Sequence, residues 1–498
     1  MRLKTLLTTI VLAIPFYGFC QYDSIVNQMK REFDAFKKGI EQEHQQFKSR
    51  NDSIFSAFLK ESWESFHLLY KPKPAEKPKP VVQPALRQGE DLKNLPTETI
   101  PADSSSVGRH IIPGKQQNES LPSENFLGTE KVSETSITVD YFGTPLSVST
   151  SLAPPDLSNL DSKGISAYFD LISGSASLMQ FTKKLLLLKR ERKLNDWGYL
   201  QLVRSSARKI THSENEAELI SWVTLLKSGI NAKVGYTTDQ VLLMVPSFED
   251  IYVSWYIKIN EKPYYILNDG TTKEKVSSLI VHKADYPGNL PVSLELNELP
   301  ILDKSLVSRE FSFRDNKFTI SVNRNLMDFF KSYPQSNMRV FFATPLSLQI
   351  SQSLDTFLVP KMKNLTERQK VALLLEFTQK AFAYKTDRDQ FNREKFYFPD
   401  ELFFYPFSDC EDRSILFTRL VKHFTGLNCI GLDYPKHVNT AVAMGENASG
   451  DFIRYKKTKY LICDPTYINA PVGYLPKEYN DIKPEVINFE QNHQDEDL

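Results

Sequence analysis

The chain has 498 residues, of which 41% are hydrophobic, 24% charged and 12% aromatic; this is enough apolar surface for ordinary globular cores but too little for a polytopic membrane protein. The length exceeds that of a usual single domain, so we expect two or three folded units. Lys plus Arg equals Asp plus Glu at 61 each, so no overall charge favours nucleic acid or an anionic membrane as a partner.

The first 20 residues predict a secretory signal peptide. Arg2 and Lys4 precede a mostly apolar stretch that runs to Phe19 and contains no acidic residue. A cut after Cys20 leaves Gln21 as the mature N-terminus. An uncleaved membrane anchor is the weaker interpretation because the stretch is shorter than a full span, and bulky Phe19 disfavours a lipid anchor on Cys20. We therefore expect a secreted or periplasmic protein with no integral membrane segment after cleavage.

Three segments are expected to lack a core of their own. Residues 21–70 are polar and nearly free of Gly and Pro, and their apolar residues recur every seven positions, which predicts an amphipathic helix. The repeat consists of Phe33, Ile40, Phe47 and Ile54, with Phe58 beside it. This helix can self-associate as a coiled coil or pack onto a neighbouring domain. Residues 71–135 are Pro-rich and predict a disordered linker, and residues 481–498 form an acidic tail that we expect to be frayed.

An internal repeat with an offset of 195 residues spans the part of the chain between the linker and the tail. The segment 213–216 resembles 408–411, and each precedes an apolar helical run. The segment 265–269 resembles 460–464 at the same offset. We therefore predict two related domains.

The two predicted domains comprise residues 136–300 and 301–480. Each has a strand-rich lead-in, a helix, a short capped helix and a three-stranded meander, which makes the fold class α+β. The lead-ins are residues 137–148 and 310–322, where apolar residues alternate. A core-facing helix is expected at residues 366–384 of the second copy.

Cys410 is the strongest candidate nucleophile. If Cys20 leaves with the signal peptide, three cysteines remain, so at least one thiol stays unpaired in an oxidising compartment. An apolar helical run follows Cys410 and places it at a helix N-terminus, where the exposed amides and the helix dipole favour a thiolate. Neighbouring acids oppose that effect unless they point outward, so the sign of the pKa shift stays open. These acids are Asp409, Glu411 and Asp412.

His437 and Asp464 complete a predicted triad. His437 opens a strand-like run after a turn, from which its imidazole can take the thiol proton. Asp464 ends an apolar strand and can orient the imidazole. His423 is the rival base, but its spacing makes it an exposed residue near a helix C-terminus. A zinc site of Cys410, His437 and Cys463 is disfavoured because no close ligand pair exists, and we expect no metal or cofactor.

Three motifs resemble those of the transglutaminase-like superfamily: Ser-Asp-Cys-Glu-Asp-Arg at 408–413, Lys-His-Val-Asn at 436–439 and Cys-Asp-Pro-Thr-Tyr at 463–467. The resemblance covers roughly residues 364–476. It implies a papain-like catalytic triad of Cys410, His437 and Asp464, carried on a helix that packs against a small antiparallel barrel, in an exported bacterial type. Tyr405 is a candidate to assist the oxyanion.

The first copy is expected to be degenerate. The offset places Asn215 where Cys410 stands and Leu242 where His437 stands, with gaps in the alignment around Leu242, while Asp269 matches Asp464. Asn has no nucleophilic side chain and Leu cannot move a proton. The first copy is therefore expected to supply an interface or part of a substrate cleft.

A Cys-His-Asp triad supports acyl transfer through a thioester. Water as acceptor gives hydrolysis by a cysteine peptidase or amidase, which we favour, and an amine gives crosslinking. Export makes secreted proteins and envelope peptides, including peptidoglycan peptides, the available substrates. The alternative is a non-catalytic envelope scaffold or binding protein built on the same fold.

Overall fold

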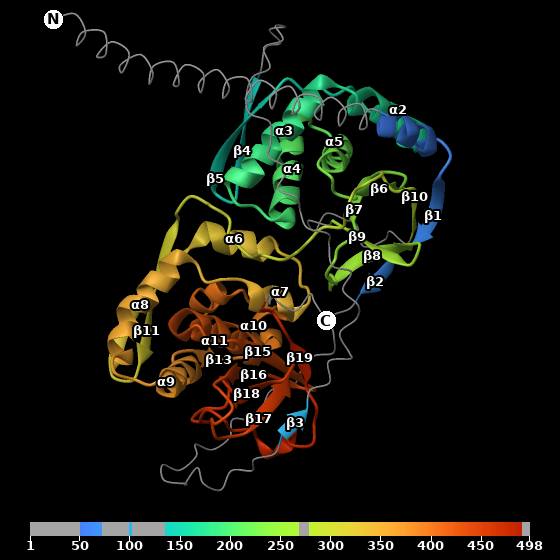
Figure 1. The fold of residues 1–498 in the computed structure, drawn as a ribbon. Helices are drawn as coiled ribbons and strands as arrows, with labels where there is room; N and C mark the ends of the chain where they lie inside the picture. Colours follow the sequence, from blue (N-terminus) through green and yellow to red (C-terminus); the bar gives the residue numbers. More distant parts are fainter. Residues whose placement is uncertain (1–49, 72–98, 102–134, 268–277, 491–498) are drawn as a thin grey trace, which may run out of the picture.

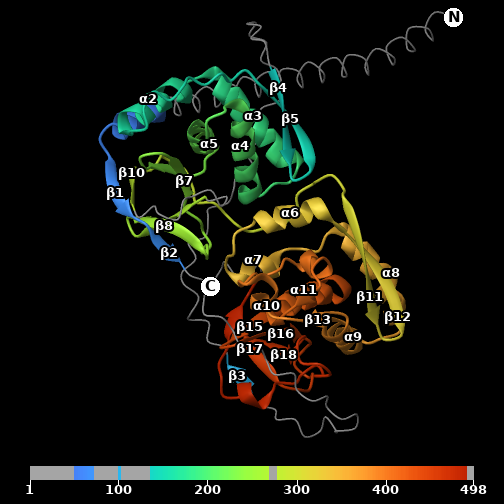
Figure 2. The same ribbon diagram turned by 180° about the vertical axis from the view of Figure 1, so that it is seen from behind.

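The computed structural model describes residues 50–71, 99–101, 135–267 and 278–490, and it has the α+β fold expected from the sequence (Figure 1). Two curled antiparallel sheets are each accompanied by helices, and α6 (Arg324–Ser332) and α7 (Met338–Ala343) lie between them (Figures 1 and 2). The signal peptide, most of the amphipathic helix, most of the linker, Asp269 and residues 491–498 lie outside the described residues. In the described part of the chain, no helix combines the length and apolar character needed to cross a membrane.

The first sheet has seven strands in the order β1-β10-β6-β7-β9-β8-β2. Its strands are β1 (Trp63–His67), β2 (Leu69–Lys71), β6 (Lys233–Tyr236), β7 (Val241–Val245), β8 (Ser254–Ile259), β9 (Lys262–Ile266) and β10 (Ser278–His282). Only Leu68 separates β1 from β2, yet these strands form opposite edges of the sheet. The sheet therefore curls until both of its edges reach one short segment.

The prediction of a helix as far as residue 70 is wrong, because a helix covers residues 50–59 and the chain then forms β1 and β2. β1 pairs with β10 and β2 pairs with β8, so the open sheet edges decide the structure of this segment rather than its local spacing. Phe55 packs on Phe169 and Trp222 in the core. Ile54 and Phe58 of the seven-residue repeat are 44% and 53% exposed.

Four helices and a hairpin accompany the first sheet. Each helix begins after a residue whose side chain accepts an N–H of the first turn, which satisfies an amide that would otherwise lack a partner. The elements are β4 (Thr135–Tyr141), β5 (Thr144–Thr150), α2 (Ser162–Ser173), α3 (Ala176–Glu191), α4 (Asp196–Ile210) and α5 (Glu214–Lys227). The hairpin β4–β5 contains the first predicted lead-in and packs on α3 and α4.

The second sheet has six strands in the order β19-β15-β16-β18-β17-β3. Its strands are β3 (Thr99–Pro101), β15 (Cys429–Tyr434), β16 (His437–Ala443), β17 (Phe452–Tyr455), β18 (Thr458–Cys463) and β19 (Glu485–Ile487). β3 comes from a distant part of the sequence and pairs in parallel with β17 at one edge (Figure 1). The predicted three-stranded meander is wrong in both copies, because β18 lies between β16 and β17 just as β9 lies between β7 and β8.

The helical part of the second half carries the predicted nucleophile. Its remaining elements are β11 (Leu306–Phe313), β12 (Asn316–Asn323), α8 (Leu348–Met362), α9 (Glu367–Lys380), β13 (Ala383–Tyr384), α10 (Asp387–Phe391), η3 (Pro399–Phe403), β14 (Phe407–Ser408), α11 (Cys410–Thr425) and η4 (Lys477–Tyr479). The second lead-in is the hairpin β11–β12. The helix predicted at 366–384 is α9, which Thr366 caps through a capping box and which ends before β13.

The six strands of the second sheet have the same order as the six strands of the first sheet that remain when β1 is left out. The order β10-β6-β7-β9-β8-β2 matches β19-β15-β16-β18-β17-β3, and in both cases a helix, α5 or α11, precedes the strands and packs on them. The final pair differs, since β2 is antiparallel to its neighbour and β3 is parallel. The repeat found in the sequence is thus accompanied by a repeat in topology.

The start of the predicted acidic tail is ordered in the sheet. β19 pairs with β15, and Phe489 is buried and stacks on Phe342 with ring centroids 5.1 Å apart. The prediction of a frayed segment from residue 481 is therefore wrong for residues 485–490. A three-residue strand within an acidic segment gives too weak a local pattern to be found without its partner.

Gly450 is required by a close approach of two chain segments. It has φ +125°, and a Cβ built on it would lie 2.7 Å from the Cα of Gly473. We expect Gly450→Ala to lower the unfolding free energy by about 2–3 kcal/mol, because strain adds to a backbone clash. Gly445→Ala is the control, since its φ is +87° but its Cβ meets open space. Equal losses in urea denaturation of the two variants would contradict the contact.

Candidate active site

Cys410 is the first residue of α11, as the sequence predicts. β14 (Phe407–Ser408) pairs in parallel with β13 and delivers the chain to Asp409, the N-cap residue. α11 packs on α9, β15 and β16, and Ser414 Oγ donates to the carbonyl of Val438 at 3.0 Å. This bond ties the second turn of α11 to Val438, the residue next to His437. The thiol is buried, with Cys410 only 4% exposed.

His437 and Asp464 form a buried pair. His437 opens β16, and its Nε2 lies 2.6 Å from Oδ2 of Asp464, the residue that directly follows β18. Oδ1 of Asp464 accepts the backbone N–H groups of Thr466 at 2.9 Å and Tyr467 at 3.2 Å. Gln379 of α9 donates to the Asp464 carbonyl at 2.9 Å. Asp464 is therefore held through its side chain and through its backbone carbonyl, and it keeps the imidazole in one orientation.

Two tyrosines that sequence reasoning missed enclose His437. The Tyr479 ring stacks on the imidazole with centroids 5.5 Å apart, and the Tyr467 ring meets it edge-on at 5.4 Å. Tyr467 closes the motif at 463–467, so its place beside Asp464 could have been found. Tyr479 lies in η4, and nothing in its local sequence indicates this contact.

The sequence-predicted contact between Cys410 and His437 is not formed. Cys410 Sγ donates to Oε2 of Glu411 at 2.9 Å. Nδ1 of His437 is buried and has no hydrogen-bond partner among the described residues. Because Nε2 faces the Asp464 carboxylate, the neutral ring carries its lone pair on Nδ1. The structure thus brings His437 and Asp464 together and leaves a basic nitrogen open.

The surroundings of Cys410 favour the thiol. Burial raises its pKa well above the ordinary value, and the carboxylates of Glu411 and Asp409 raise it further. The backbone N–H of Val438 lowers the pKa, but it is the weaker influence. The sign of the pKa shift, which the sequence leaves open, is therefore upward in this arrangement, because burial and the acids outweigh the helix start.

The acids beside Cys410 do not point outward. Asp409, Glu411 and Asp412 are buried, and burial together with the neighbouring carboxylates raises the pKa of Asp409 and of Asp412 well above the usual range. Asp412 is nevertheless part of the fold, since it accepts the backbone N–H of Asp409 at 3.3 Å and that of Tyr397 at 3.0 Å. The helix start that holds Cys410 is built on buried carboxyl groups.

Asp400 makes the stability of this region depend on pH. Its Oδ1 accepts the N–H of Ser347, its Oδ2 is buried without a partner, and burial raises its pKa to about 6. A carboxyl group whose pKa rises on folding stabilises the fold at low pH and loses that contribution as the pH passes its folded pKa.

We expect the wild type to lose roughly 3 kcal/mol of unfolding free energy between pH 4 and pH 8 relative to Asp400→Asn, because the variant cannot ionise. Urea denaturation at both pH values measures this difference. Asp315→Asn is the control, since Asp315 is exposed in the β11–β12 turn. A constant difference between the wild type and Asp400→Asn at both pH values would contradict the prediction.

Tyr405 and His423 contact residues other than His437 and Asp464. The Tyr405 ring packs on Phe391 and Tyr397 with centroids 5.1 and 5.0 Å apart, an arrangement that supports the fold rather than an oxyanion. His423 lies near the C-terminus of α11 and meets Asp355 at 2.7 Å. Its position agrees with the expectation of an exposed helix residue.

The first copy has neither a thiol nor an imidazole at the corresponding positions. Asn215 lies in the first turn of α5, and its Oδ1 accepts the N–H of Val241 at 2.8 Å, so it joins the helix to β7. Met244 pairs with Ile266 as Val442 pairs with Leu461.

Counting back from these pairs, the residue that corresponds to His437 is Asp239, and Leu242 corresponds to Thr440. The offset therefore gave the wrong residue, because the stretch from Cys410 to Val442 is three residues longer than the stretch from Asn215 to Met244, and two of the three additional residues lie in the β15–β16 hairpin. A turn that differs in length shifts the alignment of all residues before it. The first copy therefore has a carboxyl group where the second copy has an imidazole.

Comparisons with protein-family models, with curated proteins and with solved structures find no match to this chain.

Proposed function

We propose that the chain is a transglutaminase-like cysteine enzyme that performs acyl transfer, with Cys410 as nucleophile, His437 as base and Asp464 as the orienting acid. The observation that carries the proposal is the open Nδ1 of His437, buried without a partner while Nε2 is held by Asp464. An unpaired buried acceptor costs about 1–3 kcal/mol, and a purely structural role for the histidine leaves this cost at Nδ1 without a compensating function.

Residues 301–480 are proposed to form the catalytic domain and residues 136–300 its degenerate relative. Two observations support this division: the matching strand orders of the two sheets, and the placement of α5 and α11 directly before their strands. The first domain then serves as an interface or as part of the substrate cleft, because the first turn of α5, which begins at Glu214 and contains Asn215, has no thiol.

In the proposed reaction Cys410 begins as a thiol, since burial and its acidic neighbours hold its proton. The sulfur turns from Glu411 toward His437, and Nδ1 takes the proton as the sulfur attacks the carbonyl carbon of an amide. The resulting imidazolium, steadied by Asp464, gives its proton to the leaving amine. An acyl thioester on Cys410 remains, and attack by water releases the acid and regenerates the thiol.

Hydrolysis is the favoured outcome, which makes the chain a cysteine peptidase or amidase. Water is abundant, whereas transfer to an amine needs a site that excludes water. With export predicted from the first 20 residues, the proposed substrates are secreted proteins or envelope peptides, including peptidoglycan peptides.

The second candidate function is a non-catalytic envelope scaffold. One observation favours it: the thiol hydrogen-bonds Glu411 rather than His437 and lies among carboxylates that oppose its ionisation. Under this alternative the buried pair of His437 and Asp464 only stabilises the sheet.

Iodoacetamide alkylation at neutral pH, followed by peptide mass spectrometry, distinguishes the two functions. We expect His437→Ala to slow alkylation of Cys410 by roughly tenfold or more, because the proton acceptor is lost. His423→Ala is the matched control and should leave the rate unchanged. Cys429 and Cys463 are buried free thiols whose alkylation reports general opening of the fold in the same digest. The scaffold would be favoured if Cys410 is alkylated at the same rate in the wild type and in His437→Ala, and if that rate equals the rates of Cys429 and Cys463.

A further inference from the structure

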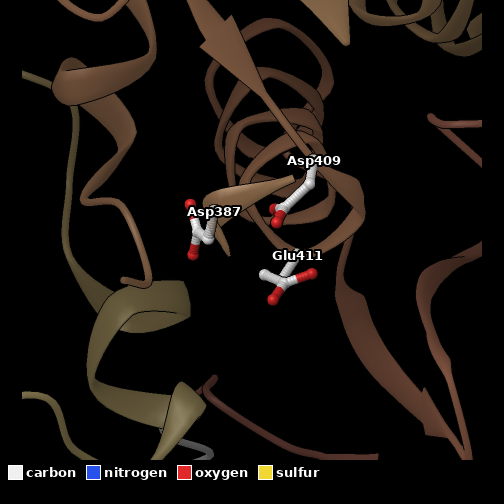
Figure 3. A group of neighbouring side chains, drawn as sticks. All are labelled: Asp387, Asp409 and Glu411. Carbon is white, nitrogen blue, oxygen red and sulfur yellow. The ribbon is translucent and has the colours of Figure 1, made fainter. Parts of the chain in front are cut away.

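Three carboxylates converge beside the nucleophile. Asp387 opens α10, and Asp409 and Glu411 flank Cys410 at the start of α11. One oxygen of each lies within 4.8 Å of the oxygens of the other two. Figure 3 shows the Asp409 carboxylate turned toward Asp387 and Glu411. The three residues are at most 5% exposed.

The structure leaves part of this cluster without a partner. Oδ1 of Asp409 is buried and has no hydrogen-bond donor among the described residues. Arg413 directs its donors to Ser408 Oγ and to the carbonyls of Gln379 and Phe382. The Nζ of Lys395 pairs with Glu401. The buried cations of this region therefore serve other acceptors, while like charges gather at short distances in an environment of low polarity.

We propose that Asp387, Asp409 and Glu411 bind a hard divalent cation, with Ca²⁺ as the best fit. The donor set is entirely carboxylate oxygen, which suits Ca²⁺, Mg²⁺ or Mn²⁺ rather than Zn²⁺ or Cu²⁺. Oxygens that bind Ca²⁺ at about 2.3–2.6 Å lie up to about 5 Å apart, whereas ligands of Mg²⁺ at about 2.1 Å lie no more than about 4.2 Å apart. All three oxygens lie within 4.8 Å of one another, so one Ca²⁺ ion can reach them without movement of the carboxylates.

The cation would also change the hydrogen bonding of Cys410. Glu411 now accepts the S–H of Cys410 through Oε2. A cation that binds this carboxylate competes with the sulfur for it and frees the sulfur to turn toward His437. This regulatory consequence rests on the proposed function, whereas the binding of the ion does not.

Isothermal titration calorimetry of CaCl₂ into the chelator-treated full chain tests the site. We expect one Ca²⁺ per chain, and a loss of affinity of about tenfold or more in Asp409→Asn, because one ligand loses its charge. Asparagine also caps helices well, so this variant should keep the start of α11. Glu411→Gln is a second variant, and Asp315→Asn is the exposed control that should bind as the wild type does. Circular dichroism establishes that each variant is folded.

Absence of Ca²⁺ binding by the wild type would overturn the site. So would folded Asp409→Asn and Glu411→Gln variants that bind Ca²⁺ with the affinity of the wild type. Tighter binding of MgCl₂ than of CaCl₂ would overturn the choice of calcium. Cys410→Ala should bind Ca²⁺ like the wild type, so the ion can be found at this site even if the thiol proves inert. Failure of the metal site and failure of the catalytic proposal are therefore distinguishable.

Discussion

Replacing Asp464 by alanine is expected to lower the unfolding free energy by about 3–5 kcal/mol. The carboxylate is fully buried and accepts three hydrogen bonds, from His437 Nε2 and from the backbone N–H groups of Thr466 and Tyr467. Its removal leaves all three groups buried without an acceptor, and each such group costs about 1–3 kcal/mol before relaxation. Urea denaturation with a shared m-value measures the loss.

Asp464→Asn separates the role in stability from the role in orienting His437. Its Oδ1 can still accept the two backbone N–H groups, so we expect a smaller loss of stability than in Asp464→Ala. Its amide group faces Nε2 with donors, which favours the tautomer that carries the proton on Nδ1. Alkylation of Cys410 should then slow as it does in His437→Ala. Equal stability losses in the two Asp464 variants would contradict the assigned hydrogen bonds.

Replacing Arg413 by alanine is expected to lower the unfolding free energy by about 3–5 kcal/mol. Arg413 is 2% exposed, and its guanidinium joins the N-terminal turn of α11 to the C-terminal end of α9. It donates to the carbonyl of Phe382 at 2.7 Å, to that of Gln379 at 3.4 Å and to Ser408 Oγ at 3.2 Å. The carbonyls at a helix C-terminus have no partner within the helix and form the negative end of its dipole. The guanidinium therefore satisfies these acceptors and also interacts favourably with the dipole.

Arg413→Lys should recover only part of the stability, because a single ammonium group cannot reach three acceptors in the geometry of a guanidinium. Arg454→Ala is the matched control, since Arg454 is exposed and pairs with Glu446 at the surface. We expect that variant to lose much less stability than Arg413→Ala, because an exposed ion pair is screened by solvent. A loss in Arg413→Ala as small as that of Arg454→Ala would show that the two helices are held together by other contacts.

The parts of the site that carry strong local signals could be predicted from the sequence. Cys410 follows a capping residue and precedes an apolar helical run, His437 follows a turn that contains a proline, and Asp464 stands between an apolar strand and a proline. Each signal depends on neighbouring residues only. The structure places all three at the ends of α11, β16 and β18 as expected.

Features that depend on distant segments could not be predicted. The absence of Gly and Pro favours a helix that continues to residue 70, but the two open edges of the first sheet turn residues 63–71 into strands. The burial of Asp409, Glu411 and Asp412 depends on the chain between β13 and η3 covering the start of α11. The hydrogen bond from Cys410 to Glu411 accompanies that burial, and the sign of the Cys410 pKa shift, which the sequence leaves open, is upward.

Acyl transfer to Cys410 is the central claim, and a generic acyl donor tests it without knowledge of the substrate. The full chain is treated with p-nitrophenyl acetate, quenched in acid and digested, and acetylation of each cysteine is followed by mass spectrometry. We predict that an acetyl thioester forms on Cys410 faster than on Cys429 or Cys463, and that His437→Ala abolishes the difference. Acetylation of Cys410 at the rate of the other two thiols, or unchanged in His437→Ala, would contradict the proposed enzyme.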